Sequence, residues 1–171
     1  MMERRAFLLS SALLSGCGYK AGTHADLLPS TVQTIAVPAF DNLTNRYRLS
    51  ERLPGAISRE FISRTRYRIV SKPDEADATL RGAVVNFLTF PNVTDPTSGR
   101  SVGTQIIVIL QVSLTENKTG KVLYTRPAME YRQRYEIAVD QPVYFEESDV
   151  ALDRLSRDVA RTLVSSVLEA F

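Results

Sequence analysis

The segment from Ser101 to Thr115 alternates between two kinds of side chain along its whole length and constrains the fold more than any other part of the sequence. Successive side chains of a β-strand point to opposite faces, so this pattern predicts one long strand. Its first face is aliphatic and should lie in the core: Ile106, Val108, Leu110, Val112 and Leu114. Its second face places Ile107 and Ile109 among glutamine and serine, so we expect it to be lightly covered or to contact a partner.

Two other segments show the spacing of amphipathic helices. The first carries Leu49, Leu53, Ile57 and Phe61. We expect Ser50 to be its N-cap, which would place Pro54 in the first turn, where a proline is tolerated. The second carries Leu152, Leu155, Val159, Leu163 and Val167, with Ser148 as the expected cap. Acidic residues at its start, among them Glu146 and Glu147, suit the helix dipole.

Strands are also predicted at Thr31–Val37, Thr79–Phe90 and Lys121–Ile137, and Tyr67–Val70 looks extended. Residues 91–100 form a polar loop and residues 116–120 a hairpin loop containing glycine. Pro127 implies that the last strand is an edge strand or contains a bulge. The order β-α-β-β-β-α predicts an α/β (α+β) fold, a two-layer sandwich in which two helices pack on a mixed sheet of about four strands. A crossover between parallel strands would surround the first helix.

The first seventeen residues have the layout of an export signal, with Arg4 and Arg5 before an apolar run that is too short to span a membrane. Leu14-Ser15-Gly16-Cys17 resembles the bacterial lipobox. That resemblance implies a lipid linked to Cys17, removal of residues 1–16, and, because Gly18 is not aspartate, an outer-membrane destination. An ordinary signal peptide with a chance cysteine, or a buried free cysteine, are the alternatives.

We therefore divide the chain into a signal peptide (1–16), a lipidated tether (17–30) and a single periplasmic domain (31–171). Part of the tether could instead be a leading segment packed on the domain. Processing removes Glu3 with the two arginines, which lowers the net charge from +2 to +1. Basic residues concentrate between Arg46 and Lys72, whereas acidic residues predominate after Glu136.

The sequence offers little catalytic chemistry, because it contains one cysteine and one histidine, His24. One cysteine excludes an intrachain disulfide and a multi-cysteine zinc site. The sequence contains no phosphate-binding or hydrolase motif, and its paired carboxylates fall at a helix start and in a turn. We predict no catalytic residue, no metal, and no cofactor apart from the covalent lipid on Cys17. An envelope hydrolase would have to rely on His24.

A row of arginines is the best candidate for ligand binding. Arg126, Arg132 and Arg134 are predicted to share one face of the last strand, about 7 Å apart at roughly 3.3 Å per residue. Such a row suits lipid phosphates or carboxylates, and it suits pairing with neighbouring strands equally well. The basic run from Arg46 is either a solvated helix face or a contact for a phosphorylated lipid or an acidic protein. Few aromatic residues interleave with it, so we do not predict nucleic-acid binding.

Several segments together resemble the LptE family of lipopolysaccharide-assembly lipoproteins. They are Cys17-Gly18-Tyr19, the strand and loop at 34–44, the helix end at 59–70, and the strand entry at 76–82. The resemblance implies an outer-membrane lipoprotein on the periplasmic side that sits inside the β-barrel partner LptD. It also implies a role in assembling that barrel and in delivering lipopolysaccharide, without enzymatic activity. The family binds lipopolysaccharide through basic residues, for which Arg126, Arg132 and Arg134, with Arg52 and Arg59 behind them, are the candidates by pattern.

Residues 34–44 also resemble the opening strand of TolB-like and curli-secretion lipoproteins. The alternative is therefore a lipoprotein subunit of a secretion or TolB-like envelope complex, which would form homo-oligomeric rings or contact cell-wall proteins.

Overall fold

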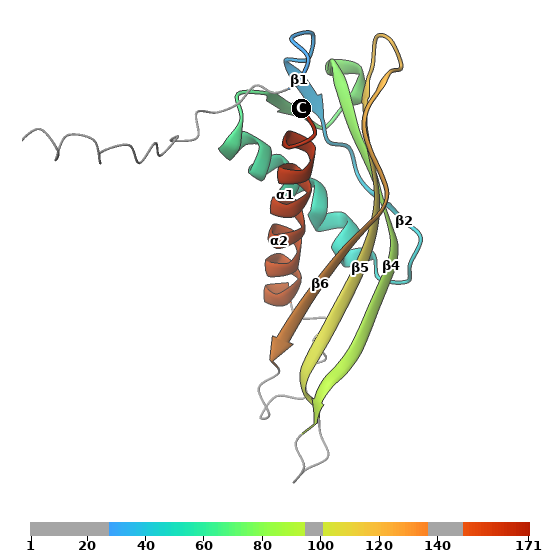
Figure 1. Cartoon of the computed structure of the whole chain (residues 1–171), viewed down its shortest axis with the longest axis vertical. Coiled ribbons are helices and arrows are strands. Elements are labelled where there is room, and N and C mark those ends of the chain that lie inside the picture. Colours follow the sequence, from blue (N-terminus) through green and yellow to red (C-terminus); the bar gives the residue numbers. More distant parts are fainter. Residues whose placement is uncertain (1–27, 95–100, 137–148) are drawn as a thin grey trace, which may run out of the picture.

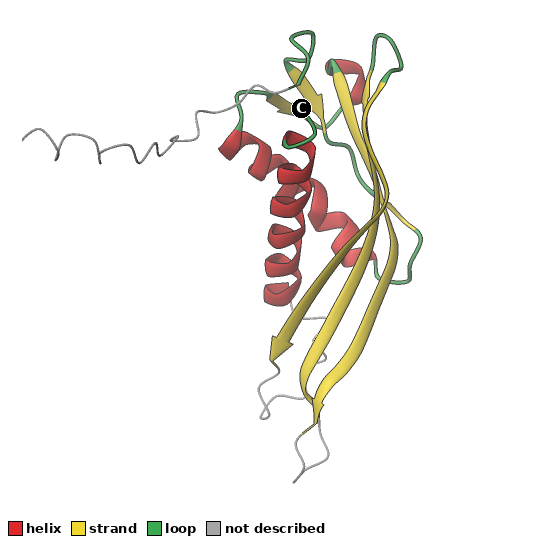
Figure 2. Ribbon diagram, viewed as in Figure 1, coloured by secondary structure: helices red, strands yellow, loops and turns green. Residues whose placement is uncertain are grey.

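The structure is a computed structural model that describes residues 28–94, 101–136 and 149–171. The elements follow the order β1 (Thr34–Ala36), β2 (Asp41–Asn42), α1 (Tyr47–Arg64), β3 (Arg68–Val70), a 3-10 turn η2 (Pro73–Glu75), β4 (Ala78–Thr94), β5 (Ser101–Glu116), β6 (Val122–Glu136) and α2 (Asp149–Leu168). Both helices pack on one face of a twisted sheet (Figures 1 and 2). The predicted two-layer α+β sandwich is confirmed.

The sheet has six strands, with β3, β1, β4, β5 and β6 in spatial order and β2 also beside β4. The sequence predicts about four strands, which is too few, because it indicates a loop at β2 and only an extended segment at β3. β1 pairs in parallel with β3 and with β4, as expected for strands on either side of a helix. β4, β5 and β6 form successive antiparallel hairpins. The three long strands continue beyond the short ones (Figure 1).

The core lies between the helices and the predicted aliphatic face of β5. All five of its residues, from Ile106 to Leu114, are buried, and their register partners on β4 include Leu80 and Val84. Helix residues that follow the predicted spacing pack over them, and Leu53, Ile57, Phe61, Leu155 and Leu163 are completely buried. Leu28 also lies in this core, and its N–H donates to the Tyr67 hydroxyl at 2.9 Å.

The two helices run in the same direction. Arg52 near the start of α1 pairs with Asp153 near the start of α2, and Arg64 at the end of α1 bonds to Ser165 near the end of α2. The two contacts are twelve residues apart on each helix. The polar pairs therefore connect the helices near both ends of their shared surface.

Helix α1 begins four residues earlier than predicted, because its N-cap is Arg46 and not Ser50. Asn42 and Thr44 form a turn in which the Thr44 hydroxyl accepts the Arg46 N–H at 3.0 Å, which allows the helix to start at Tyr47. The Ser50 hydroxyl instead donates to the Tyr47 carbonyl. Pro54 consequently lies inside the helix and leaves one carbonyl of the preceding turn without its helical donor. The predicted cap Ser148 lies outside the described residues.

The β4–β5 hairpin is longer than predicted. β4 continues to Thr94 through register shifts near Pro91 and Val93, so the first four residues of the expected loop at 91–100 are strand, and residues 95–100 lie outside the described residues. The hairpin after β5 is confirmed: the Gly120 N–H donates to the Glu116 carbonyl at 2.9 Å, and Gly120 has a φ of 70°. Pro127 lies on an edge strand and within a bulge, so both of its predicted settings occur.

Gly82 gives a test of the packing between β4 and the loop after β1. A Cβ atom at this position would overlap the ring of Phe40, which is buried against the strand. We expect Gly82→Ala to lower the free energy of unfolding by about 1–3 kcal/mol, because the ring must move out of a filled site. Urea unfolding of Gly82→Ala alone and combined with Phe40→Leu measures this. The second change should relieve part of the loss, and a fully stable single variant would contradict the packing.

Candidate functional site

The candidate site is the sheet surface that faces away from both helices. There the three long strands form three cross-strand rows, and we call their nine residues the outer sheet face. The rows are Asn86–Ile109–Glu130, Leu88–Ile107–Arg132 and Phe90–Gln105–Arg134. Leu88 is 37% exposed and Phe90 is 46% exposed, so large apolar side chains stand in solvent on this surface. The sequence predicted this second face of β5 as lightly covered, and it lies on the side opposite the helices (Figure 1).

The outer sheet face changes in character across the strands. β4 contributes Leu88 and Phe90, β5 contributes two isoleucines, and β6 contributes Arg132 and Arg134. Hydrocarbon can therefore lie against β4 and β5 while an anionic group contacts β6. An amphiphile with phosphate beside acyl chains has this combination of groups.

Electrostatics distinguishes the two arginines of this face. Arg132 forms an ion pair with Glu130 on its own strand. The hydrogen bond to Glu130, followed by its charge, raises the pKa of Arg132 above its ordinary value. No salt bridge joins Arg134 to a carboxylate whose side chain the structure describes. Glu130, the carboxylate that pairs with Arg132, belongs to the same strand and not to a neighbouring strand.

The prediction that Arg126 shares this face is wrong. Arg126 is in register with Val112, on the face that points toward the helices, whereas Arg132 is in register with Ile107. The register shift between Leu110 and Val112 gives β6 one extra residue, in the segment that contains Pro127. An extra residue in a bulge reverses the face of everything beyond it.

The two helix arginines lie in the other layer of the molecule. Arg52 pairs with Asp153 of α2, and Arg59 is exposed on α1. The sheet separates α1 from the outer sheet face (Figure 1). The five predicted arginines therefore do not form one cluster. Of the five, only Arg132 and Arg134 lie on the outer sheet face.

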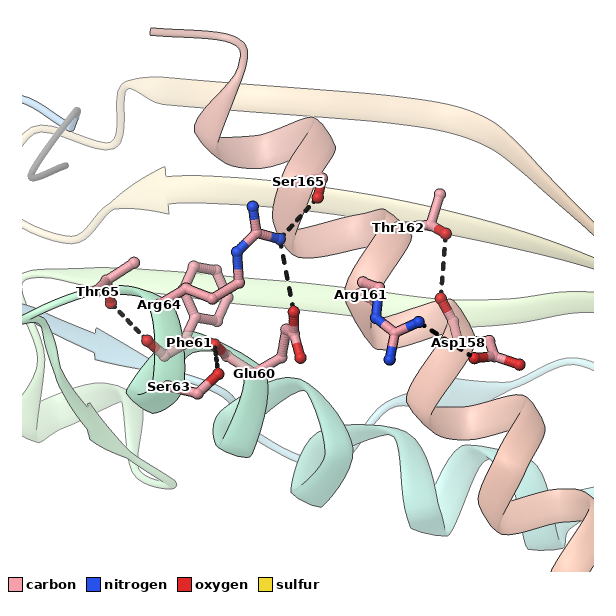
Figure 3. A network of polar contacts seen from close by, with 9 residues as sticks. All are labelled: Glu60, Phe61, Ser63, Arg64, Thr65, Asp158, Arg161, Thr162 and Ser165. Carbon is pink, nitrogen blue, oxygen red and sulfur yellow. Dashed lines mark hydrogen bonds and ion pairs between the residues drawn. The ribbon is translucent and has the colours of Figure 1, made fainter. Parts of the chain in front are cut away.

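A polar network between the helices explains another part of the basic run (Figure 3). The Arg64 guanidinium donates to the Ser165 hydroxyl at 2.7 Å and lies 3.5 Å from a Glu60 carboxylate oxygen. On α2, Arg161 lies 3.8 Å from Asp158. Sequence reasoning missed the contact between Arg64 and Ser165 because the two residues lie 101 positions apart, and periodicity carries no signal for such distances. Arg52 and Arg64 thus connect the two helices. This role differs from both predictions for the basic run from Arg46, a solvated helix face and a contact for a phosphorylated lipid or an acidic protein.

Tyr131 joins β6 to α2 and gives a pH-dependent prediction. Burial, followed by the charge and hydrogen bond of Asp158, raises the pKa of Tyr131 to about 12. In the unfolded chain the Tyr131 hydroxyl has its ordinary pKa of 10.0. Unfolding therefore releases a proton from this hydroxyl between about pH 10 and pH 12. Stability should therefore fall as pH rises through this window, and it should fall less in Tyr131→Phe. Thermal midpoints measured from pH 9 to pH 12 test this, and equal slopes for the two proteins would contradict it.

The described part of the chain contains no helix long and apolar enough to cross a membrane. Within the same ranges, no three metal-ligating side chains come together. A polar pocket of about 780 Å³ lies beside β1 and β3, where Arg66 and Arg68 line it together with Gln33 and Thr34. The described residues that line it include no carboxylate. Cys17 and His24 lie outside the described residues.

Comparison with known proteins places this geometry in a family. The model of the family LptE, described as lipopolysaccharide-assembly, matches residues 32–167. Curated protein sequences give no match. Among solved structures, a Xanthomonas campestris protein is 12% identical, with a TM-score of 0.53, over 84% of this chain and 90% of its own. The PelC dodecamer from Paraburkholderia phytofirmans is 13% identical, with a TM-score of 0.52, over 85% and 94%.

A hypothetical protein from Chlamydia trachomatis is 13% identical, with a TM-score of 0.51, and the match covers 79% of this chain and 95% of that protein. At these identities the structural likenesses establish a shared fold. The family match spans most of the sequence, including both helices and all six strands of the sheet. The chain therefore belongs to the lipopolysaccharide-assembly family LptE.

Proposed function

We propose that this LptE-family protein is an outer-membrane lipoprotein, anchored on the periplasmic side through lipid on Cys17. It assists assembly of the barrel LptD, sits within it as a plug, and helps deliver lipopolysaccharide to the outer leaflet. Membership of the family supports a role in lipopolysaccharide assembly rather than in catalysis. Lipid anchoring rests on the lipobox at residues 14–17, and the barrel partner rests on what the family implies.

The outer sheet face is the observation that supports lipid binding most directly. Leu88, Phe90 and the two β5 isoleucines offer an apolar surface next to Arg132 and Arg134. Exposed apolar surface of this kind in a soluble domain is typical of an interaction site. We propose that phosphate groups of lipopolysaccharide contact the two arginines while acyl chains lie on the apolar rows. Arg126, Arg52 and Arg59 are no longer proposed as parts of this site, because they lie on other surfaces.

Purification of the tagged, full-length protein from membranes in a mild detergent tests the partnership. We expect a large outer-membrane β-barrel to co-purify in roughly equal amount, and a tagged unrelated lipoprotein of the same membrane should not recover it. Recovery of no barrel would overturn the proposed partnership.

The alternative, a subunit of a secretion or TolB-like complex, predicts a different assembly. The mass of the detergent-extracted complex separates the two: a ring of identical chains supports the alternative, whereas one copy with a barrel supports the proposed function.

A further inference from the structure

One edge of the sheet is open along part of β4. β2 pairs with β4 only through Asp41 and Asn42, opposite Ala83 and Val84. The last bond on this side is donated by the Leu43 N–H to the Val84 carbonyl, at 2.9 Å. Beyond Val84, no strand within the described residues pairs with this side of β4, which forms the lower right border of the sheet in Figure 1. We call the segment Val85–Phe90 the open edge.

Backbone groups of the open edge are directed outward. Val84 points its carbonyl oxygen toward the β2 side. Residues that share one face of a strand also direct their N–H and C=O groups to the same side. Phe87 and Thr89 share the face of Val84, because their register partners on β5 are buried as its own partner is. Their N–H and C=O groups therefore lie on the open side, while those of Leu88 bond to β5.

Exposed apolar side chains gather beside the same segment. Val85 is 36% exposed, and Leu88 and Phe90 of the outer sheet face follow it. Next to them, Leu43 is 69% exposed, and Tyr47 is 61% exposed and lines a small pocket with Phe87. β4 carries no charged residue from Gly82 to its end at Thr94. An uncharged, partly apolar edge is a template for pairing with another strand.

The opposite edge of the sheet is built differently. β6 carries Arg126, Glu130, Arg132 and Arg134 and is interrupted by Pro127 and a bulge. Charges, proline and bulges are the devices that keep edge strands from pairing. The segment Val85–Phe90 carries neither charge nor proline. One register shift lies at its start, between Val84 and Asn86, and Pro91 follows its end, so the unprotected edge is limited to this segment.

We propose that the open edge pairs with an extended, uncharged strand of the protein partner. This inference rests on the proposed function, in which that partner is the outer-membrane barrel. A charged incoming strand would find no opposite charge along Val85–Phe90. A second copy of this chain is disfavoured, because six residues of strand pairing give a small contact, whereas stable interfaces bury about 1,200–2,000 Å². The paired strand must belong to a molecule held by further contacts.

Hydrogen exchange of the full-length protein, alone and in its purified complex with the barrel, tests the pairing. We expect the amides of Phe87 and Thr89 to exchange at least tenfold more slowly in the complex. The amide of Leu88, which bonds to β5 in both states, is the internal control. Unchanged exchange at Phe87 and Thr89 in a complex that contains the barrel would overturn the pairing and leave the proposed function standing. Failure to isolate any such complex would count against the proposed function instead.

A pair of variants gives a second readout. Thr89→Pro removes the outward N–H, whereas Thr89→Val keeps it and only replaces the hydroxyl. We expect at least tenfold less barrel to be recovered with Thr89→Pro and no change with Thr89→Val, at equal circular dichroism. Equal recovery with both folded variants would contradict the pairing. If Thr89→Pro does not fold, the exchange experiment on the unaltered chain decides. A dimer of this chain alone with slow exchange at Phe87 and Thr89 would assign the edge to a second copy and overturn the proposal.

Discussion

Replacement of Arg132 and Arg134 together by glutamate is expected to weaken lipopolysaccharide binding by about tenfold while the fold survives. Both residues lie on the outer sheet face, in the same cross-strand rows as the exposed Leu88 and Phe90 of β4, with one residue of β5 between them. Single exposed charge contacts are weak, but reversal exchanges attraction for repulsion at two adjacent positions. It also places a new carboxylate beside Glu130, which would repel a phosphate further. Binding of purified lipopolysaccharide at physiological and at high salt measures the effect, and high salt should reduce the difference.

A matched control lies on the other layer. Arg154 and Arg157 are exposed on α2, so Arg154→Glu with Arg157→Glu changes the net charge by the same amount away from the outer sheet face. We expect lipopolysaccharide binding of this control to remain close to that of the unaltered protein. Equal binding by both double variants would assign Arg132 and Arg134 to pairing within the strand rather than to a ligand.

Cys17→Ser is expected to lose its lipid, and when it is produced in excess over the barrel, the share that no barrel holds should leave the outer-membrane fraction. The lipobox implies a diacylglycerol and a further acyl chain at this residue, and each buried CH₂ contributes about 0.8 kcal/mol to membrane binding. Three chains hold a protein permanently, whereas the remaining domain has no helix in its described part that could replace them. Membrane fractionation and the mass of the amino-terminal peptide measure the loss of anchor and of lipid.

Gly18→Asp is the control for this prediction, because aspartate after the lipidated cysteine is the usual signal for retention in the inner membrane. This variant should keep its lipid and change only its membrane. If the share of Cys17→Ser protein produced in excess over the barrel still fractionates with the outer membrane, the anchor is not lipid on this cysteine.

The layers of the fold were predictable because both helices and β5 each bury one regular face. Leu53, Ile57 and Phe61 follow helical spacing and are all fully buried, and the alternation of β5 matches its fully buried and its partly exposed residues. Burial of one face imposes the period of the secondary structure on the sequence. The two short strands β2 and β3 were harder to predict, because two or three residues carry no measurable period and their pairing depends on β1 and β4.

The site was predictable only in part, and Arg126 shows why. Counting by twos along β6 places Arg126 with Arg132 and Arg134, but the bulge beside Pro127 shifts the count by one. Pro127 indicated a bulge or an edge position but not the number of extra residues in the strand. The partners of Arg52 and Arg64 could not be predicted either, since Asp153 and Ser165 lie 101 residues further along the chain. The open edge of β4 likewise depends on where β2 stops pairing.

The central claim is that lipopolysaccharide lies on the outer sheet face, and photo-crosslinking in living cells tests it most directly. A photoreactive residue at Ile107, in the middle row of that face, is compared with one at Ile62, which is 60% exposed on α1. The account predicts a lipopolysaccharide adduct at position 107 and none at position 62. An adduct at position 62 alone, or at neither position in a strain that assembles its outer membrane normally, would contradict it.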